Sequence, residues 1–351
     1  MPCDNVVGCR NSRAEQSRAC DCIHLAVSPW DLTDDYNQHC GVTIASFLDN
    51  CHGAKAAVHL LYNEKLSLKN PEGSEINKKK YGELCEKFGA ELFYHHVELP
   101  EWVYELKSVQ KWTPGTLMRL YLPELLPDVE KILYLDCDVV VNTDVRAIWN
   151  TSVLHAPLAA VPDSDIPRFS LKRVRLYHSL NIDPAKYFCA GVLLFNLDYL
   201  RRTISLSERS MDILRTYPEL PFLDQDILNI LFHQSYVHLP GHYNRYMYYP
   251  DVDTENGILH YAAGSKPWKS SHGEIDLPYW NYLLQTPWGD DPNTVLCSVL
   301  LLPNLAYIHE QSFSTLFDQT GLPYTTLMKK IIPAIFSLTR KRIGDFRNSH
   351  L

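Results

Sequence analysis

Two aspartates separated by a single residue give this sequence its first chemical signal. Asp136 and Asp138 interrupt the otherwise apolar run of residues 134–141, YLDCDVVV. Read as one strand, this run places both carboxylates on the same face, because side chains two residues apart point the same way. Buried carboxylates are costly unless a cation compensates them. Mg²⁺ or Mn²⁺ bound to a phosphorylated substrate suits such a pair, and aspartates that merely cap a turn are the alternative.

A second group of suitable side chains follows in residues 260–268, HYAAGSKPW. The His260 imidazole is a ligand that manganese accepts. Gly264 would let the backbone approach a pyrophosphate, and Lys266 would neutralise its charge. The structural alternative for His260 is a core histidine with satisfied hydrogen bonds.

Three further segments have residues that suit either a site or ordinary structure. Residues 188–196, FCAGVLLFN, read as a buried strand whose glycine permits close packing. Residues 224–229, DQDILN, place acids at a helix start, where they also favour the helix dipole. Arg119 lies in a predicted helix, where a solvated cation on the helix face is the simple interpretation.

The elements that must position these residues alternate between strand and helix. Apolar runs at 23–27, 56–62 and 91–97 predict strands, with helices at 40–48 and 74–88 between them. A helix over 116–126 precedes the acidic segment, and further strands are expected at 158–161, 191–196 and 258–261, with a helix over 224–232. This alternation predicts a parallel α/β sheet, in which ligands bind beyond the carboxyl ends of the strands. Asp136, Asp138 and Asp163 all follow such ends.

Composition narrows the class of protein. The chain has 351 residues, 46% hydrophobic and 21% charged, as expected for an ordinary soluble globular protein with a full core. Its formal charge of -8 argues against a nucleic-acid binder. No run of about 20 apolar residues predicts a membrane span. Of the ten cysteines, four gather in the N-terminal tail without a common zinc spacing, so we expect reduced thiols and a cytoplasmic protein.

In their order and spacing these motifs resemble glycosyltransferase family 8. These are retaining, sugar-nucleotide-dependent hexosyltransferases that include the galactosyl- and glucosyltransferases of lipopolysaccharide. The resemblance runs from about Ile23 to Trp268, and more weakly through residues 279–282 and 286–288. It implies an α/β, GT-A type, Rossmann-like nucleotide-sugar-binding fold with a mixed central sheet and a smaller, mostly helical C-terminal segment.

The resemblance also implies roles for individual residues. Asp136, Asp138 and His260 would bind Mn²⁺ or Mg²⁺, which bridges the phosphates of a UDP-sugar, and Gly264 and Lys266 would hold the pyrophosphate. Asp224, Gln225 and Asp163 would line the sugar and acceptor pocket as the catalytic candidates. Tyr36 would stack on the uracil. The remaining donor-binding residues would be Ala26, Asp34, Asp35, Arg119, Cys137 and Cys189.

Three positions depart from the family's pattern. Thr33 stands where the family usually has aspartate, and Asp35 stands where it has asparagine, so the contacts to uridine differ. Cys189 replaces a common asparagine, which removes an amide from the donor-sugar pocket.

The resulting expectation is an enzyme that moves galactose or glucose from a UDP-sugar to a glycan or glycolipid hydroxyl, in lipopolysaccharide or other cell-surface glycan synthesis. A retaining double displacement needs a carboxylate nucleophile. Asp224 is a candidate by position only, so we favour attack by the acceptor on the face that the phosphate leaves. One alternative is a catalytically silent UDP-sugar or glycan-binding relative. Another is a nucleotidyl- or phosphoryltransferase, which would need a nucleophile-activating residue or a Walker-type glycine loop, and the sequence contains no such loop.

We expect three regions along the chain. These are a disordered tail over 1–22, the catalytic domain over 23–270, and a C-terminal segment over 271–351. The last region mixes cations with apolar residues between 327 and 347, which favours peripheral contact with the inner face of a membrane. A C-terminal helix packed on the domain is the alternative.

Overall fold

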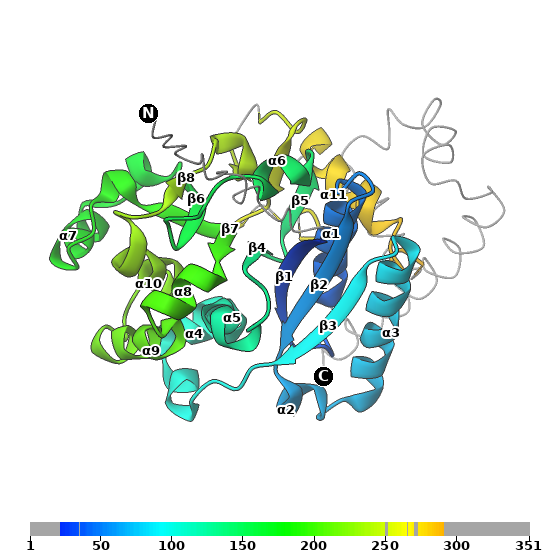
Figure 1. The fold of residues 1–351 in the computed structure, drawn as a ribbon, viewed down its shortest axis with the longest axis horizontal. Helices are drawn as coiled ribbons and strands as arrows, with labels where there is room; N and C mark the ends of the chain where they lie inside the picture. Colours follow the sequence, from blue (N-terminus) through cyan, green and yellow to red (C-terminus); the bar gives the residue numbers. More distant parts are fainter. Residues whose placement is uncertain (1–21, 35, 250–251, 265, 270–272, 291–351) are drawn as a thin grey trace, which may run out of the picture.

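A seven-stranded sheet forms the centre of the computed structural model, which describes residues 22–34, 36–249, 252–264, 266–269 and 273–290. The strands stand in the order β3-β2-β1-β4-β7-β6-β8 (Figure 1). Their bounds are β1 (Cys22–Trp30), β2 (Lys55–Tyr62), β3 (Glu91–His96), β4 (Lys131–Leu135), β6 (Leu158–Pro162), β7 (Phe188–Asn196) and β8 (Val237–His238).

The sheet is parallel in one half and mixed in the other. Strands β3, β2, β1 and β4 run parallel, as the alternating pattern predicts. Strand β7 runs antiparallel to both of its neighbours, β4 and β6. The prediction of a parallel sheet was therefore wrong for β7, whereas the mixed sheet implied by the family resemblance is confirmed. All nine residues of β7 are buried, so its apolar run carries no sign of its direction.

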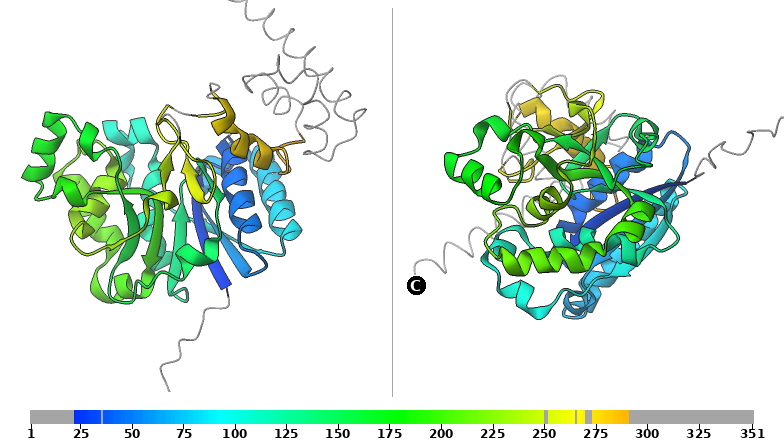
Figure 2. Two further views of the ribbon diagram at one scale, coloured as in Figure 1. Left: turned by 90° about the horizontal axis from the view of Figure 1, so that it is seen from above. Right: turned by 60° about the vertical axis from the view of Figure 1, so that its left-hand side comes forward.

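Helices cover both faces of this sheet. On one face α1 (Tyr36–Asp49) and α3 (Pro71–Lys87) pack on β1 and β3 (Figures 1 and 2). Helix α3 begins with Pro71, and the side chain of Asn70 accepts a hydrogen bond from the Gly73 amide, a common helix start. On the other face lie the 3₁₀ segment η2 (Pro114–Tyr121) and α10 (Leu223–Phe232).

The remaining helices surround these layers. They are α2 (Glu64–Ser67), α4 (Lys107–Trp112), α5 (Leu122–Leu125), α6 (Val145–Trp149), α7 (Leu171–Ser179), α8 (Leu197–Thr203), α9 (Leu206–Thr216) and α11 (Leu277–Leu283). The 3₁₀ segments are η1 (Glu101–Glu105), η3 (Ile166–Arg168), η4 (Pro184–Lys186), η5 (Gly241–Tyr243) and η6 (Gly273–Asp276). Helix α11 packs against α1 and so joins the C-terminal part of the described chain to the main sheet.

A second, three-stranded sheet changes the interpretation of the acidic segment. Its strands are β5 (Val139–Asn142), β10 (Gly257–His260) and β9 (Arg245–Tyr246). Strand β4 of the large sheet ends at Leu135, and β5 of the small sheet begins at Val139. The prediction of one continuous strand over 134–141 was therefore wrong. Asp136, Cys137 and Asp138 form the connection between two sheets.

Most other predicted elements are present, with one exception. The predicted helix over 116–126 is a 3₁₀ segment, η2, followed by the short helix α5. Pro114 and Pro123 remove backbone donors from this stretch, which prevents one continuous α-helix.

The terminal regions leave two predictions untested. Apart from Cys22, which begins β1, the tail predicted over 1–22 lies outside the described residues, as does the basic region between 327 and 347. Within the described ranges, no helix is both long and apolar enough to cross a membrane.

Candidate active site

A cavity of about 490 Å³ opens where the two sheets meet, beyond the carboxyl ends of β1 and β4. This volume falls within the roughly 300–1,000 Å³ of small-molecule sites. Its lining combines the connection between β4 and β5, the end of β1, residues of α4 and η2, the start of α10 and the segment after β10. The carboxyl ends of parallel strands thus form the rim, as the fold class predicts.

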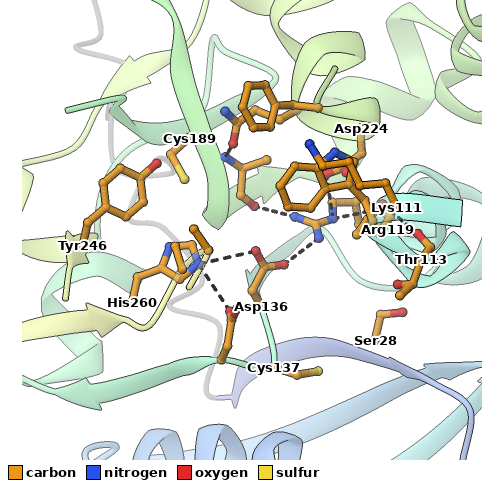
Figure 3. Close-up of a pocket in the computed structure, with 18 of the residues that line it drawn as sticks. Ser28, Lys111, Thr113, Arg119, Asp136, Cys137, Cys189, Asp224, Tyr246 and His260 are labelled. Atoms are coloured by element: carbon orange, nitrogen blue, oxygen red, sulfur yellow. Dashed lines mark hydrogen bonds and ion pairs between the residues drawn. The ribbon is translucent and has the colours of Figure 1, made fainter. Parts of the chain in front are cut away.

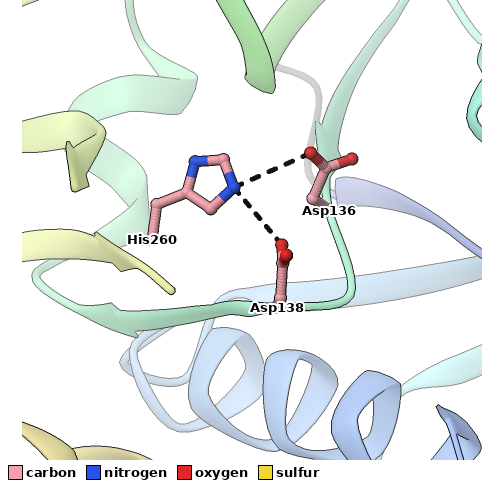
Figure 4. A group of neighbouring side chains, drawn as sticks. All are labelled: Asp136, Asp138 and His260. Carbon is pink, nitrogen blue, oxygen red and sulfur yellow. Dashed lines mark ion pairs between the residues drawn. The ribbon is translucent and has the colours of Figure 1, made fainter. Parts of the chain in front are cut away.

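Asp136, Asp138 and His260 meet at one end of this cavity. One ligand atom from each lies within 4.8 Å of the others (Figure 4). Nε2 of His260 lies 3.3 Å from Oδ1 of Asp138 and 3.9 Å from Oδ2 of Asp136. Strand pairing causes this convergence, because His260 on β10 pairs with Val139, the residue next to Asp138. Two carboxylates and one imidazole form a donor set that suits manganese or magnesium.

Neighbouring residues prepare His260 to act as a ligand. Its Nδ1 lies 2.8 Å from Oδ1 of Asn244, which accepts the Nδ1 proton and so turns Nε2 toward the carboxylates. Gly191 makes room for the ring, since a Cβ atom at this position would lie 2.3 Å from Cε1 of His260. The ring is therefore fixed both in orientation and in place.

The carboxylates also fit a cation. Oδ1 of Asp138 is buried and accepts no hydrogen bond from any described residue, so it is available as a ligand. Its Oδ2 accepts a hydrogen bond from Lys266. Burial alone would raise the pKa of Asp138, but Lys266 and His260 outweigh burial and hold this pKa below its usual value. Burial alone would lower the pKa of His260, and Asp138 instead raises it to about 10.

Arg119 is buried among acids, so its interpretation as a solvated cation on a helix face was wrong. Its guanidinium lies 2.6 Å from Oδ1 of Asp136 and 3.3 Å from Oδ2 of Asp224 (Figure 3). It also donates to the carbonyl of Ala190 at 2.6 Å and lies 4.0 Å from the centre of the Tyr134 ring. Burial would lower its pKa, but the two carboxylates raise it, so Arg119 remains charged.

The three catalytic candidates are neighbours, because Asp224 and Gln225 are adjacent in the chain and Gln225 contacts Asp163. Asp224 is buried beside Arg119, and burial raises its pKa to about 6 although Arg119 opposes the shift. Gln225 is hydrogen bonded at both ends: Oε1 accepts from the Ala190 amide at 2.9 Å, and Nε2 donates to Asp163 at 3.2 Å. Burial also raises the pKa of Asp163.

Only some of the predicted donor-binding residues line the cavity. Asp34, Tyr36, Cys137 and Cys189 line the cavity together with Lys266. Ala26 is fully buried in the core and Gly264 is exposed, and the cavity lining includes neither. Asp35 lies outside the described residues.

Sequence reasoning missed a large part of the lining. The missed residues include Trp30, Lys111, Trp112, Thr113, Asp165, Phe169, Arg173, Phe222, Tyr246, Tyr248 and Lys269. Most lie in loops or at helix ends, where no periodic pattern exposes them. The structure adds one signal, since Trp30, Thr113 and Ala263 have positive φ angles, which non-glycine residues adopt mainly in strained or functional segments.

Comparisons with known proteins agree with this geometry. A family model described as glycosyl transferase family 8 matches residues 30–272. General stress protein A of Bacillus subtilis is 24% identical over 286 residues, 75% of this chain and 94% of that protein. Lipopolysaccharide 1,3-galactosyltransferase of Salmonella typhimurium is 22% identical over 304 residues, 81% of this chain and 85% of that protein.

Other relatives are longer, and the chain spans 29% of glycosyltransferase GlyA of Streptococcus pneumoniae. Among solved structures, galactosyltransferase LgtC in complex with donor and acceptor sugar analogues superposes with a TM-score of 0.63 at 22% identity. The superposition covers 76% of this chain and 96% of LgtC. At this identity the likeness establishes the fold, which is that of the GT-A enzymes.

Proposed function

Because this chain belongs to glycosyl transferase family 8, we propose that it transfers a hexose from a UDP-sugar to a hydroxyl of a glycan or glycolipid. The observation that carries the proposal is the convergence of Asp136, Asp138 and His260 with Lys266 at one end of the cavity. A sugar nucleotide needs both a cation and a basic side chain at its diphosphate.

Galactose or glucose is the proposed sugar. Relatives named as lipopolysaccharide glucosyl- and galactosyltransferases support this choice, although their identities to this chain are between 22% and 28%. The same relatives support a role in lipopolysaccharide or another cell-surface glycan. In this proposal the enzyme works in the cytoplasm, with residues 327–347 contacting the inner face of the membrane. Vesicle flotation of the full chain, compared with a chain ended before residue 327, tests this contact.

The protein's own residues would handle the charge of the reaction. A bound Mn²⁺ or Mg²⁺ would be held by Asp136, Asp138 and His260, and would stabilise the negative charge that grows on the departing diphosphate. Lys266 would exchange its hydrogen bond to Asp138 for one to the diphosphate, on the side of the diphosphate away from the cation. Arg119 fixes the Asp136 carboxylate, and its bond to Asp224 holds that acid in place.

The geometry disfavours a double displacement through Gln225 or Asp224. The oxygen of Gln225 already accepts the Ala190 amide, and an amide is a poor nucleophile. Asp224 is paired with Arg119, which lowers the nucleophilicity of its oxygen. We therefore propose that the acceptor hydroxyl attacks on the face that the diphosphate leaves, and that the diphosphate takes its proton. A covalent hexosyl adduct on Asp224 or Asp163 in mass spectra of the intact protein would falsify this route.

Hydrolysis of UDP-galactose and UDP-glucose without an acceptor tests the core of the proposal. We expect Mn²⁺-dependent release of UDP and free hexose, reduced at least 100-fold in Asp138→Asn, which removes the ligand charge and keeps the side-chain shape. Asp212→Asn, on an exposed face of α9, is the matched control. Release of UMP would instead indicate a nucleotidyl- or phosphoryltransferase. Binding of UDP-sugar with no turnover of any kind would indicate a catalytically silent relative.

A further inference from the structure

A row of aromatic rings and cations lines the part of the cavity that the donor proposal leaves unused. The guanidinium of Arg173 lies 4.6 Å from the ring centre of Phe169 and 4.5 Å from that of Phe222. The rings of Phe222 and Trp112 are 5.5 Å apart, and Nζ of Lys111 lies 4.4 Å from the Trp112 ring. All five side chains line the cavity. The row thus runs from Phe169, just before α7, through Arg173 on α7 and Phe222, just before α10, to Trp112 and Lys111 at the end of α4.

This row is fixed in place by contacts with the rest of the protein. The indole nitrogen of Trp112 donates to the carbonyl of Pro221 at 2.6 Å, which joins α4 to the start of α10. Phe169 packs edge-on against the buried rings of Tyr177 and Tyr187, at 5.7 and 5.6 Å. Anchored rings present flat faces on which a sugar can stack, and they hold the neighbouring cations at defined positions.

The two cations of the row have no carboxylate partner. Among the described residues, no carboxylate oxygen lies within 4 Å of a charged nitrogen of Lys111 or Arg173, whereas Arg119 and Lys266 are both paired with acids. The nearby acid Asp165 already accepts hydrogen bonds from the hydroxyls of Tyr248 and Tyr249, both at 2.5 Å. This end of the cavity therefore has positive charge that the protein leaves available to a ligand.

The row also lies at the correct end of the cavity for an acceptor. Figure 3 shows Lys111 on the same side of Asp136 as Asp224, with His260 and Tyr246 on the opposite side. The diphosphate of the donor would be held at the His260 end, beside Lys266. A ligand on the aromatic row would therefore reach Asp224 and Gln225 without occupying the space of the diphosphate.

From these observations we propose that the acceptor is an acidic glycan, with a phosphate or carboxylate held by Lys111 and Arg173 and a sugar ring stacked on Trp112 or Phe222. This proposal rests on the proposed glycosyl transfer and specifies the class of acceptor. Charge-assisted hydrogen bonds to a phosphate or carboxylate are about twice as strong as neutral ones, so the two cations would select charged acceptors over neutral ones.

A panel of matched acceptors tests the proposal. Methyl galactoside and methyl glucoside are each compared, as acceptors, with their 3-, 4- and 6-phosphates and with the corresponding uronates. Every assay uses the UDP-sugar that the enzyme hydrolyses as the donor. We expect at least one charged acceptor to exceed its neutral parent in kcat/KM by roughly ten- to hundred-fold. Raising the salt concentration should reduce this preference, because the groups are partly exposed.

Variants assign the preference to the row. Arg173→Gln and Lys111→Gln should each remove most of the preference by raising KM for the charged acceptor, and Arg173→Lys should keep part of it. Lys172→Gln and Lys107→Gln make the same change of charge on the same two helices at exposed positions outside the cavity lining. These two controls should keep the preference.

The outcomes separate the two proposals. Absence of donor hydrolysis overturns the glycosyl transfer itself, and the acceptor class with it. Normal hydrolysis with equal kcat/KM for charged and neutral acceptors overturns the acceptor class alone. A third outcome is that free charged and neutral sugars react equally well, while Arg173→Gln and Lys172→Gln lose binding to phosphatidylglycerol vesicles to the same extent. This result would show that α7 contacts a membrane, and it would likewise overturn the acidic acceptor.

Discussion

Asn244 determines which nitrogen of His260 faces the acids. Its amide oxygen accepts the Nδ1 proton, so Nε2 is the nitrogen that points toward Asp136 and Asp138. Partners of this kind orient a ligand without touching the metal, and their loss commonly costs 10- to 100-fold in metal affinity.

We therefore expect Asn244→Ala to weaken Mn²⁺ binding by about 10-fold or more, because the His260 ring loses its fixed orientation. Calorimetric titration of the protein with Mn²⁺ in the presence of UDP measures this change in the dissociation constant. Asn244→Asp keeps an oxygen acceptor for the Nδ1 proton and should bind Mn²⁺ at least as tightly as the original protein. Equal affinity in Asn244→Ala would contradict the role of this residue.

The ligands themselves could be predicted from the sequence, and their supports could not. The proposed ligands Asp136, Asp138 and His260, together with Lys266, follow one another in a recognisable order. Asn244 and Gly191 act only through their distance to His260, and nothing in their neighbouring residues indicates it. Lys111 and Arg173 were missed for a similar reason, because only the contact between the rings of Trp112 and Phe222 brings their separate helices together.

At the scale of elements, three histidines form a hydrogen-bonded row across β1, β2 and β3. Nδ1 of His24 lies 3.0 Å from Nε2 of His59, and Nδ1 of His59 lies 3.0 Å from Nε2 of His95. His59 is 4% exposed, and burial, followed by the neighbouring histidines, lowers its pKa to about 3. Burial also lowers the pKa of His24 and of His95. The folded row is therefore uncharged at neutral pH.

This row should make the parallel half of the sheet sensitive to acid. A histidine whose folded pKa lies below its unfolded value of about 6.5 stabilises the protein above that pH, and the contribution is lost as the pH falls toward 3. We expect His59 to account for a loss on the order of 2–3 kcal/mol in the free energy of unfolding between pH 7 and pH 4. Urea unfolding of the original protein and His59→Gln at both pH values measures it.

The exposed His52 provides the control for this prediction. His52→Gln should keep the full pH dependence, whereas His59→Gln should show a smaller loss toward pH 4. Identical pH profiles for the original protein and His59→Gln would show that the row does not resist protonation.

Elements differ in how well their sequence specifies them. The early strands and helices were predicted correctly because apolar runs alternate with polar, helix-forming stretches. The direction of β7 was not readable, since a strand buried on both faces has the same pattern either way. The break between β4 and β5 was also missed, because apolar residues continue on both sides of Asp136 and Asp138.

At the scale of the whole molecule, the cavity joins parts of the chain that are distant in sequence. Residues of η2, α10 and the segment after β10 all line it, so a donor bound there contacts both sheets. A ligand that binds only the folded state stabilises it by mass action.

We expect UDP and Mn²⁺ together, at about 100 times their dissociation constants, to add about 2.7 kcal/mol of stability. For a domain of this size that corresponds to a rise in Tm of roughly 5–10 °C. Thermal unfolding with UDP and Mn²⁺, with UDP and a chelator, and with Asp138→Asn measures the dependence on metal. A rise that persists in the chelator or in Asp138→Asn would mean that these residues do not hold the cation.

The acidic connection has a mechanical consequence. Asp136 directly follows β4 of the large sheet, whereas Asp138 precedes β5 and His260 ends β10 in the small sheet. A cation bound by all three would add a cross-link between the two sheets, which already share the packing of α1 against β1 and β5. Any tilt of the small sheet against the large one must stretch or compress the ligand set, so loading of the cation and donor would stiffen this joint, and departure of the nucleotide would free it.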